Sequence, residues 1–275
     1  MKRIAYLVFA FALLGMATFA HAQGGEQPDE QEQPADAAAI IKRSQQTFYY
    51  AGDDMKATVS MELIDKDGNK RTRVLTMLRR DEAEGGNQKY FIYFHEPGDV
   101  RGMTFMVWKD PAEEDQRWIF VPAVDLIRRI AADDKRSSFV GSDFTYEDVS
   151  GRDVGSDAHT LLREEALDGR AVYVIESVPN EVVEYTKRIS WIDKETFLPL
   201  KEDYYDLQGE HYRVFTANDI QDMSDWSTVM RRTMSNIKTG HRTEVVFESI
   251  AYDQGLLDED FSERRMRRPP RAWTE

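Results

Sequence analysis

The sequence of 275 residues contains no cysteine. This absence excludes disulfide frameworks, thiol nucleophiles, zinc sites with thiolate ligands and iron–sulfur clusters. Basic residues are also few relative to acidic ones, 36 against 50, and the formal net charge is −14. Because binding to nucleic acid requires clustered lysine and arginine to neutralise phosphates, this charge argues against a nucleic-acid partner.

Signatures of catalysis and metal binding are missing as well. The sequence has no G-x-S-x-G elbow, no P-loop and no dinucleotide-binding fingerprint. The histidines beyond the first 22 residues are isolated, without the i, i+4 spacing of a helical zinc site: His95, His159, His211 and His241. We therefore predict no enzymatic activity, no metal and no cofactor. A hydrolase that uses Ser142 and Asp143 is an alternative, although Gly141-Ser142-Asp143 is also typical of a tight turn.

The one long apolar run of the sequence lies at its N-terminus. Lys2 and Arg3 precede a run that ends at Ala20, and Ala20-His21-Ala22 supplies the small–x–small pattern that signal peptidase recognises. The run is at the short limit for crossing a membrane. We predict a cleaved signal peptide over residues 1–22, a disordered acidic leader over 23–36, and export to the periplasm.

The period of the hydrophobic pattern changes after residue 52. Asp36 is a suitable N-cap for a helix over 37–50. From Met55 onward apolar and polar residues alternate, which is typical of a half-buried strand, and Asp67-Gly68 marks a hairpin turn. The same signals predict about a dozen strands, at 55–63, 71–79, 89–96, 102–109, 116–121, 159–167, 171–178, 187–193, 198–206, 211–218, 228–236 and 242–252.

The connections between these strands are too short for βαβ units, which disfavours a parallel sheet. We predict a single domain over 37–275, mainly β with a few helices, whose one antiparallel sheet is large enough to curl. Residues 125–157 break the alternation and are expected to form a loop or short helices that cross the sheet. A last helical turn is expected near 260–268, stopped by Pro269-Pro270.

These strands carry more apolar side chains than the few predicted helices can cover. An open sheet must bury its apolar face against another layer. Either long loops close an ordinary core, or the sheet is hollow and its cavity accepts an apolar ligand, a role that suits flexible methionines. For the second case we expect these residues to bind an acyl chain: Met61, Leu75, Met77, Phe91, Phe105, Trp118 and Phe120.

Two polar groups allow either a structural or a functional interpretation. The first forms a clasp over the cavity mouth or a network of caps and turns: Arg128, Arg129, Asp143 and Tyr146, with Glu147 and Asp148. The second is a basic cluster that offsets a helix dipole or docks on lipid headgroups or a membrane partner: Arg264, Arg265, Arg267, Arg268 and Arg271.

Four segments carry a resemblance to a known family. They are PGDVRG at 97–102 entering TFMVW, WIFVPAVDLIRRI at 118–130, GSDFTYEDVSGRD at 141–153, and FSERRMRRP at 261–269. With the exported leader and the long antiparallel run, residues 36–270 resemble the LolA-like outer-membrane lipoprotein-sorting proteins. The resemblance implies an incomplete antiparallel β-barrel of about eleven strands, closed by helices around a lipid-binding hollow.

The function implied by this resemblance is transport across the periplasm. A monomeric carrier would bind lipid or the acyl chains of a lipoprotein and move them between the inner and outer membranes. Its expected inner-membrane partner is an exporter of the RND type. No position matches the arginine latch of the classical carrier. The alternative is a non-enzymatic envelope sensor or scaffold that uses the same sheet to bind a membrane-protein partner.

Overall fold

The computed structural model describes residues 36–274. The predicted signal peptide (1–22) and leader (23–36) lie outside the described residues, except for Asp36 at the start of the first helix. None of the helices within residues 36–274 combines the length and the hydrophobicity that crossing a membrane requires.

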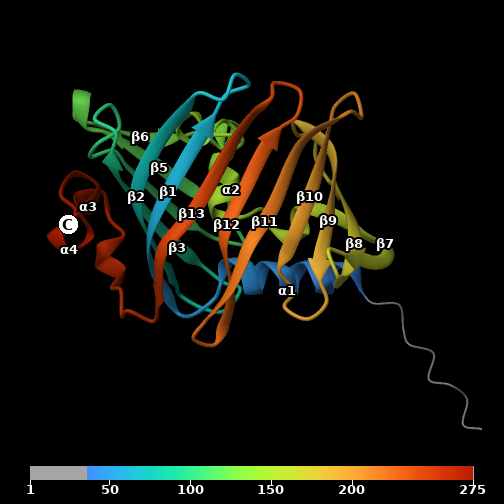
Figure 1. The fold of residues 1–275 in the computed structure, drawn as a ribbon. Helices are drawn as coiled ribbons and strands as arrows, with labels where there is room; N and C mark the ends of the chain where they lie inside the picture. Colours follow the sequence, from blue (N-terminus) through green and yellow to red (C-terminus); the bar gives the residue numbers. More distant parts are fainter. Residues whose placement is uncertain (1–35, 275) are drawn as a thin grey trace, which may run out of the picture. The chain divides into compact units, whose positions relative to one another are not determined.

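Thirteen antiparallel strands form one open sheet in the order β6-β5-β4-β3-β2-β1-β13-β12-β11-β10-β9-β8-β7 (Figure 1). The strands are β1 (Asp54–Ile64), β2 (Lys70–Asp81), β3 (Gln88–Glu96), β4 (Thr104–Lys109), β5 (Gln116–Val121), β6 (Leu126–Ile130), β7 (Asp157–Leu167), β8 (Arg170–Pro179), β9 (Tyr185–Asp193), β10 (Pro199–Asp206), β11 (His211–Met223), β12 (Trp226–Asn236) and β13 (His241–Tyr252). The predicted mainly-β class and antiparallel sheet are confirmed, and the count of eleven strands is corrected to thirteen.

Strand β6 is the one strand that lies in a segment expected to lack strands. Its sequence LIRRI is mostly exposed, because β6 forms an edge of the sheet and pairs only with β5. An edge strand with little burial lacks the alternation of apolar and polar residues by which a strand is predicted from sequence. The remaining strands match the predicted ranges to within a few residues.

The chain enters the sheet at its centre and leaves it there. From β1 it runs through consecutive hairpins to the edge at β6, crosses to the opposite edge at β7, and returns strand by strand to β13, which pairs with β1. We call residues 131–156, between β6 and β7, the crossing segment. It contains three short 3₁₀ helices and α2 (Tyr146–Ser150), so the predicted short helices are present in this part.

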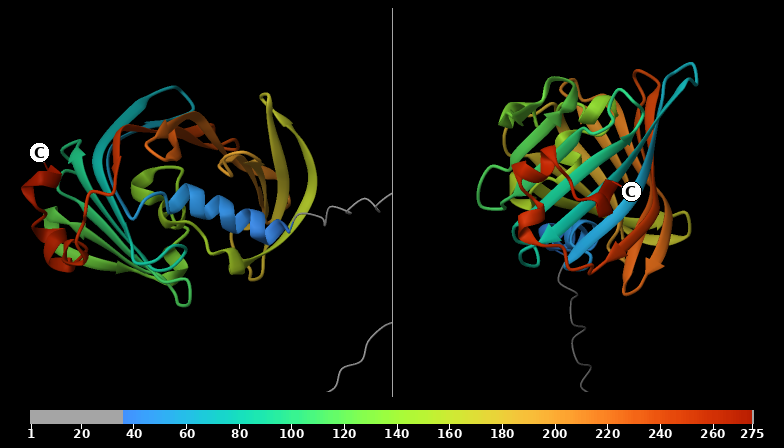
Figure 2. Two further views of the ribbon diagram at one scale, coloured as in Figure 1. Left: turned by 90° about the horizontal axis from the view of Figure 1, so that it is seen from below. Right: turned by 90° about the vertical axis from the view of Figure 1, so that its left-hand side faces the viewer.

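The sheet curls around helix α1 (Ala37–Tyr49) and the crossing segment (Figure 2, left). The Asp36 carboxylate accepts a hydrogen bond from the Ala38 amide at 3.0 Å and caps α1, as predicted. Ile40 and Ile41 lie on one face of the helix and pack against Ile175 of β8 and Ile192 of β9. Helix α1 therefore covers the concave side of the sheet near β7–β9.

The C-terminal residues cover the convex side of the other half of the sheet. Helices α3 (Glu263–Arg267) and α4 (Arg271–Thr274) lie outside β2–β5 (Figure 1). Phe261, Met266 and Trp273 pack on apolar residues of this convex face, which are Leu78, Phe91, Met106, Trp118 and Phe120. The predicted last helical turn is present, and it serves to cover this second apolar face.

Candidate functional site

An apolar cavity of about 110 Å³ lies on the concave face of the sheet. Its wall comes from β1, β2, β3, β12 and β13, with the last turn of α1 at one side. The strand residues that supply most of the apolar wall are Met55, Val59, Met61, Leu75, Met77, Ile92, Val245 and Phe247. Inward positions of neighbouring strands stand side by side, so a period of two along each strand becomes a continuous apolar surface.

The crossing segment supplies the opposite wall of this cavity. Phe139, Phe144 and Val149 all line it. The Phe139 ring lies 5.3 Å from the Phe105 ring and 6.0 Å from the Phe94 ring, and only 3% of Phe139 is exposed. The crossing segment therefore inserts aromatic side chains into the concavity.

The apolar cavity is small compared with known ligand sites. A cavity of about 150 Å³ holds one benzene ring, and sites for larger ligands have about 300–1,000 Å³. At about 110 Å³ the apolar cavity is smaller than either. A larger ligand would fit only with an outward movement of the crossing segment or repacking of the flexible methionine side chains.

The structure divides the predicted acyl-binding residues between two faces. Met61, Leu75 and Met77 line the apolar cavity, and Phe105 lies beside it under Phe139. The remaining three were expected on the same face but lie on the convex side, beneath α3 and α4: Phe91, Trp118 and Phe120. Successive residues of a strand point to opposite faces, and β3–β5 have both faces buried, so apolar character alone did not distinguish them.

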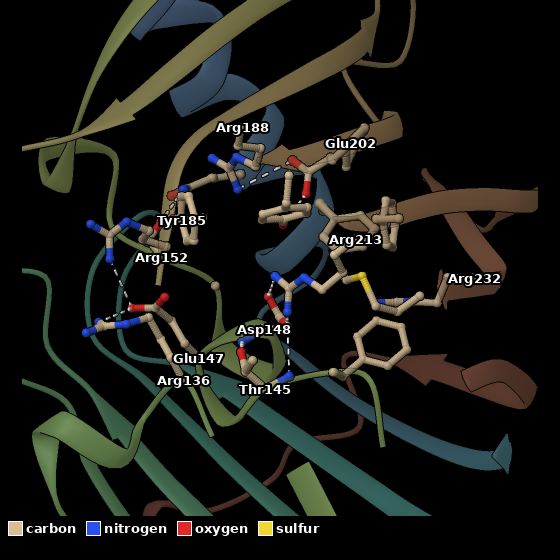
Figure 3. A pocket seen from close by; sticks show the side chains of 18 of the residues that line it. Arg136, Thr145, Glu147, Asp148, Arg152, Tyr185, Arg188, Glu202, Arg213 and Arg232 are labelled. Carbon is tan, nitrogen blue, oxygen red and sulfur yellow. Dashed lines mark hydrogen bonds and ion pairs between the residues drawn. The ribbon is translucent and has the colours of Figure 1, made fainter. Parts of the chain in front are cut away.

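A second cavity of about 90 Å³ adjoins the first and is lined by charged residues. Figure 3 shows its ion pairs: Arg213 contacts Asp148 at 3.0 Å, Arg188 contacts Glu202 at 3.4 Å, and Arg152 contacts Glu147 at 3.3 Å. Arg136 pairs with Glu184 at the rim. Burial alone would lower the pKa of Arg213, but the larger opposite effect of Asp148 and neighbouring tyrosines raises this pKa above its usual value. The guanidinium therefore stays charged.

Local turn chemistry holds Asp148 in place. The Thr145 hydroxyl accepts a hydrogen bond from the Asp148 amide, and the Asp148 carboxylate accepts one from the Thr145 amide at 2.7 Å, so the two residues form a capping box at the start of α2. The same carboxylate accepts hydrogen bonds from Arg213 of β11. The start of α2 is thereby attached to the sheet by charge.

Further polar contacts attach the crossing segment to other strands. The Asp143 carboxylate accepts a hydrogen bond from the Thr243 hydroxyl at 2.7 Å and lies 2.6 Å from Nδ1 of His241, both on β13. The buried ammonium of Lys109 on β4 donates to the carbonyls of Ser150 and Gly151, each at 3.0 Å. The segment is therefore held at several points by polar contacts and at its centre by inserted aromatic rings.

The four residues predicted as a clasp do not come together as one group. Asp143 contacts β13, whereas the Tyr146 ring packs in the core against Phe105. Burial raises the pKa of Tyr146, and the positive charge of Arg128 opposes this shift. Arg129 instead lies over the Trp118 ring at 6.0 Å, toward the convex face. The sequence pattern did not identify Arg213, which donates hydrogen bonds to Asp148 at the start of α2.

Ser142 and Asp143 do not form a nucleophile with its base in the described structure. The Ser142 hydroxyl donates to the Phe144 carbonyl at 3.2 Å, and His241 is engaged by Asp143. Nucleophilic catalysis requires a base within hydrogen-bonding distance of the hydroxyl, and no such contact joins Ser142 to His241 within residues 36–274. The same residues contain no cluster of three or more side chains suited to holding a metal ion.

The basic cluster at the C-terminus is partly neutralised. Arg267 pairs with Asp125, and Arg265 lies 3.5 Å from Asp260. This supports the structural interpretation for these two arginines. Their partners come from the loop before β6 and from the turn before α3, so the pairs help to position the C-terminal helices on the convex face.

Known proteins share this architecture over most of the chain. A family model described as an uncharacterized protein matches residues 86–268. A solved structure described as a putative outer membrane lipoprotein-sorting protein domain, from Vibrio parahaemolyticus, is 27% identical, with a TM-score of 0.78 over 84% of this chain and 98% of that one. A DUF1329 family protein from Desulfovibrio piger is 26% identical, with a TM-score of 0.76 over 83% of this chain and 98% of its own.

A LolA superfamily protein from Nitrosomonas europaea shares the fold at 19% identity, with a TM-score of 0.65 over 83% of this chain and 98% of its own. No curated protein matches the sequence. The chain belongs to the family of the matching model, and it shares its fold with the LolA superfamily protein. The descriptions of these relatives name no enzymatic activity.

Proposed function

We propose that this protein is a periplasmic carrier that binds lipid or the acyl chains of a lipoprotein on the concave face of its sheet. The observation that carries the proposal is the apolar concave face of the sheet. The crossing segment, which polar contacts hold in place, covers this face where a second sheet could have done so. The relative from Vibrio parahaemolyticus, described as a putative lipoprotein-sorting domain, supports the same role. An RND-type exporter as inner-membrane partner and a monomeric state belong to the same proposal.

Cargo enters by displacement of the crossing segment. When the segment lifts, Phe139 and Phe144 leave the concave face and an acyl chain takes their place, so one apolar surface replaces another against the sheet. Each buried methylene of the chain contributes about 0.8 kcal/mol. The polar contacts made by Asp143, Asp148 and Lys109 break when the segment opens and reform when it closes. They define one closed position of the segment without holding it there rigidly.

A disulfide that locks the crossing segment tests this route, because the chain has no cysteine of its own. The Asp143 carboxylate lies 2.7 Å from the Thr243 hydroxyl, so the two side chains meet and the double variant Asp143→Cys/Thr243→Cys brings two thiols together. We expect the oxidised variant to lose uptake of lipid from vesicles containing a fluorescent phospholipid, and dithiothreitol to restore it.

The two single cysteine variants are the matched controls, since between them they lose the same polar contacts without forming the bond. Equal uptake by the oxidised and reduced double variants would contradict entry through this segment. Uptake without delivery to acceptor vesicles would favour the envelope sensor over the carrier.

A further inference from the structure

Arg232 of β12 differs from every other arginine of the two cavities. The others each pair with a carboxylate: Arg79, Arg136, Arg152, Arg188 and Arg213. Arg232 makes no hydrogen bond or ion pair within residues 36–274. Figure 3 shows Arg232 apart from these pairs. Its Nε atom is fully buried and lacks an acceptor. The residue as a whole is partly buried. A cation with a buried and unpaired N–H group is costly, so natural proteins rarely keep one without a use.

Aromatic rings hold the Arg232 guanidinium in place. Its central carbon lies 4.6 Å from the centroid of the Phe48 ring and 4.6 Å from that of Phe247. Rings stabilise a cation and fix its direction, but they accept no hydrogen bonds from its N–H groups along the guanidinium plane. The donors of Arg232 are therefore positioned and left available.

The electrostatic surroundings of Arg232 contain no carboxylate that compensates it. The ionisable groups that act on it are the hydroxyls of Tyr49, Tyr90 and Tyr252, and burial raises the pKa of each, so all three are neutral at pH 7. Burial lowers the pKa of Arg232 to about 10, which leaves it charged at that pH. Asp148 lines the same two cavities, but Arg213 and the Thr145 amide occupy its carboxylate.

Arg232 lines both cavities, the apolar one and the charged one. A chain that occupies the apolar cavity therefore ends beside a fixed, unpaired guanidinium. Guanidinium groups bind carboxylate and phosphate through paired N–H donors, and such charge-assisted bonds are about twice as strong as neutral ones.

We propose that Arg232 is the headgroup site for an anionic amphiphile, whose acyl chain lies in the apolar cavity and whose carboxylate or phosphate accepts hydrogen bonds from the guanidinium. This inference rests on the proposed carrier function and narrows its cargo to lipids with an acidic group next to the chain. The site selects against neutral lipids of the same chain length, because these leave the cation unpaired.

Calorimetric titration with three probes of equal chain length tests this assignment: dodecanoate, dodecyl phosphate and the neutral monododecanoylglycerol, each below its micelle concentration. We expect the native protein to bind at least one of the anionic probes about tenfold or more tighter than the neutral one. The preference between dodecanoate and dodecyl phosphate identifies the carboxylate or the phosphate as the recognised group.

Arg232→Gln should remove this preference, with about tenfold weaker binding of the anionic probe and unchanged binding of the neutral one. Arg231→Gln is the matched control, because Arg231 precedes Arg232 on β12 and is exposed, and it should change neither affinity. Arg232→Lys, which keeps the charge without the paired donors, should retain part of the preference.

Equal affinity of the native protein for anionic and neutral probes overturns the inference and leaves the carrier function standing, a result that requires no variant to fold. Equal losses for both kinds of probe in Arg232→Gln also overturn it. If the native protein binds none of the three probes, the carrier function fails and the headgroup site fails with it.

Discussion

Phe139→Ala separates the closing role of the crossing segment from its contribution to stability. The ring is 3% exposed and packs against Phe94, Phe105 and Tyr146, with centroids 5.3–6.0 Å away. Removing a buried phenyl group costs about 3–5 kcal/mol. In the proposed open state this ring lies outside the core, so we expect the substitution to destabilise the closed state alone.

The substitution therefore shifts the population toward the open, binding-competent state. If about 3 kcal/mol of the cost falls on the closed state, acyl affinity rises by up to about 100-fold, since each 1.4 kcal/mol corresponds to a factor of ten. Calorimetric titration with monododecanoylglycerol measures this change, and thermal unfolding followed by circular dichroism measures the accompanying fall in Tm.

Phe91→Ala is the matched control for this prediction. Phe91 is 1% exposed but lies on the convex face under Trp273, with ring centroids 5.4 Å apart. We expect a comparable fall in Tm, about 2–4 °C per kcal/mol for a domain of this size, with unchanged acyl affinity. If Phe139→Ala leaves the affinity unchanged or weakens it, the crossing segment is not the barrier to binding and this reasoning is refuted.

Three further predictions concern stability. Gly151→Ala should lower Tm and speed amide exchange in the crossing segment, because φ is +80° there and a Cβ atom would lie 2.8 Å from the Tyr49 ring; unchanged exchange would contradict the assigned contact. Trp273→Ala should lower Tm and promote aggregation by uncovering the convex face, with lipid binding retained, whereas lost binding would place cargo on that face. Burial raises the pKa of Asp81 to about 7 despite its contact with Arg79, so the folded state keeps a proton that the unfolded chain releases near pH 4. The urea concentration at the unfolding midpoint should therefore decrease as the pH rises from 4 to 7, and Asp81→Asn should flatten that part of the profile. Parallel profiles for both proteins would contradict the shift.

The predictable part of the fold is the part in which one face of a strand is polar. In β1, Met55, Ala57, Val59, Met61 and Leu63 alternate with less buried residues, and the structure places them on the concave side. Strands β3–β5 gave no such signal. Phe105 and Met106 are both fully buried, one in the concavity and the other beneath the C-terminal helices. Both positions look alike in sequence, so the assignment of faces required the tertiary structure.

The candidate site was only partly predictable for a similar reason. The crossing segment has no period, and the insertion of Phe139 and Phe144 into the concavity depends on the distance between β6 and β7, which no local pattern encodes. Arg232 does leave a trace in the sequence. It stands two residues before Met234, at an inward position of β12, and a lone charge in an inward row is a sign of function.

Native mass spectrometry of the protein, expressed in the periplasm and purified without detergent, tests the carrier function most directly. We predict a mass above that of the polypeptide, and we predict that organic extraction releases a lipid or an acylated peptide from the complex. The oxidised Asp143→Cys/Thr243→Cys variant, locked after removal of its cargo, should show only the polypeptide mass after incubation with lipid vesicles. A native protein that stays at the polypeptide mass after the same incubation would contradict the account, because the concave face would then be an ordinary filled core.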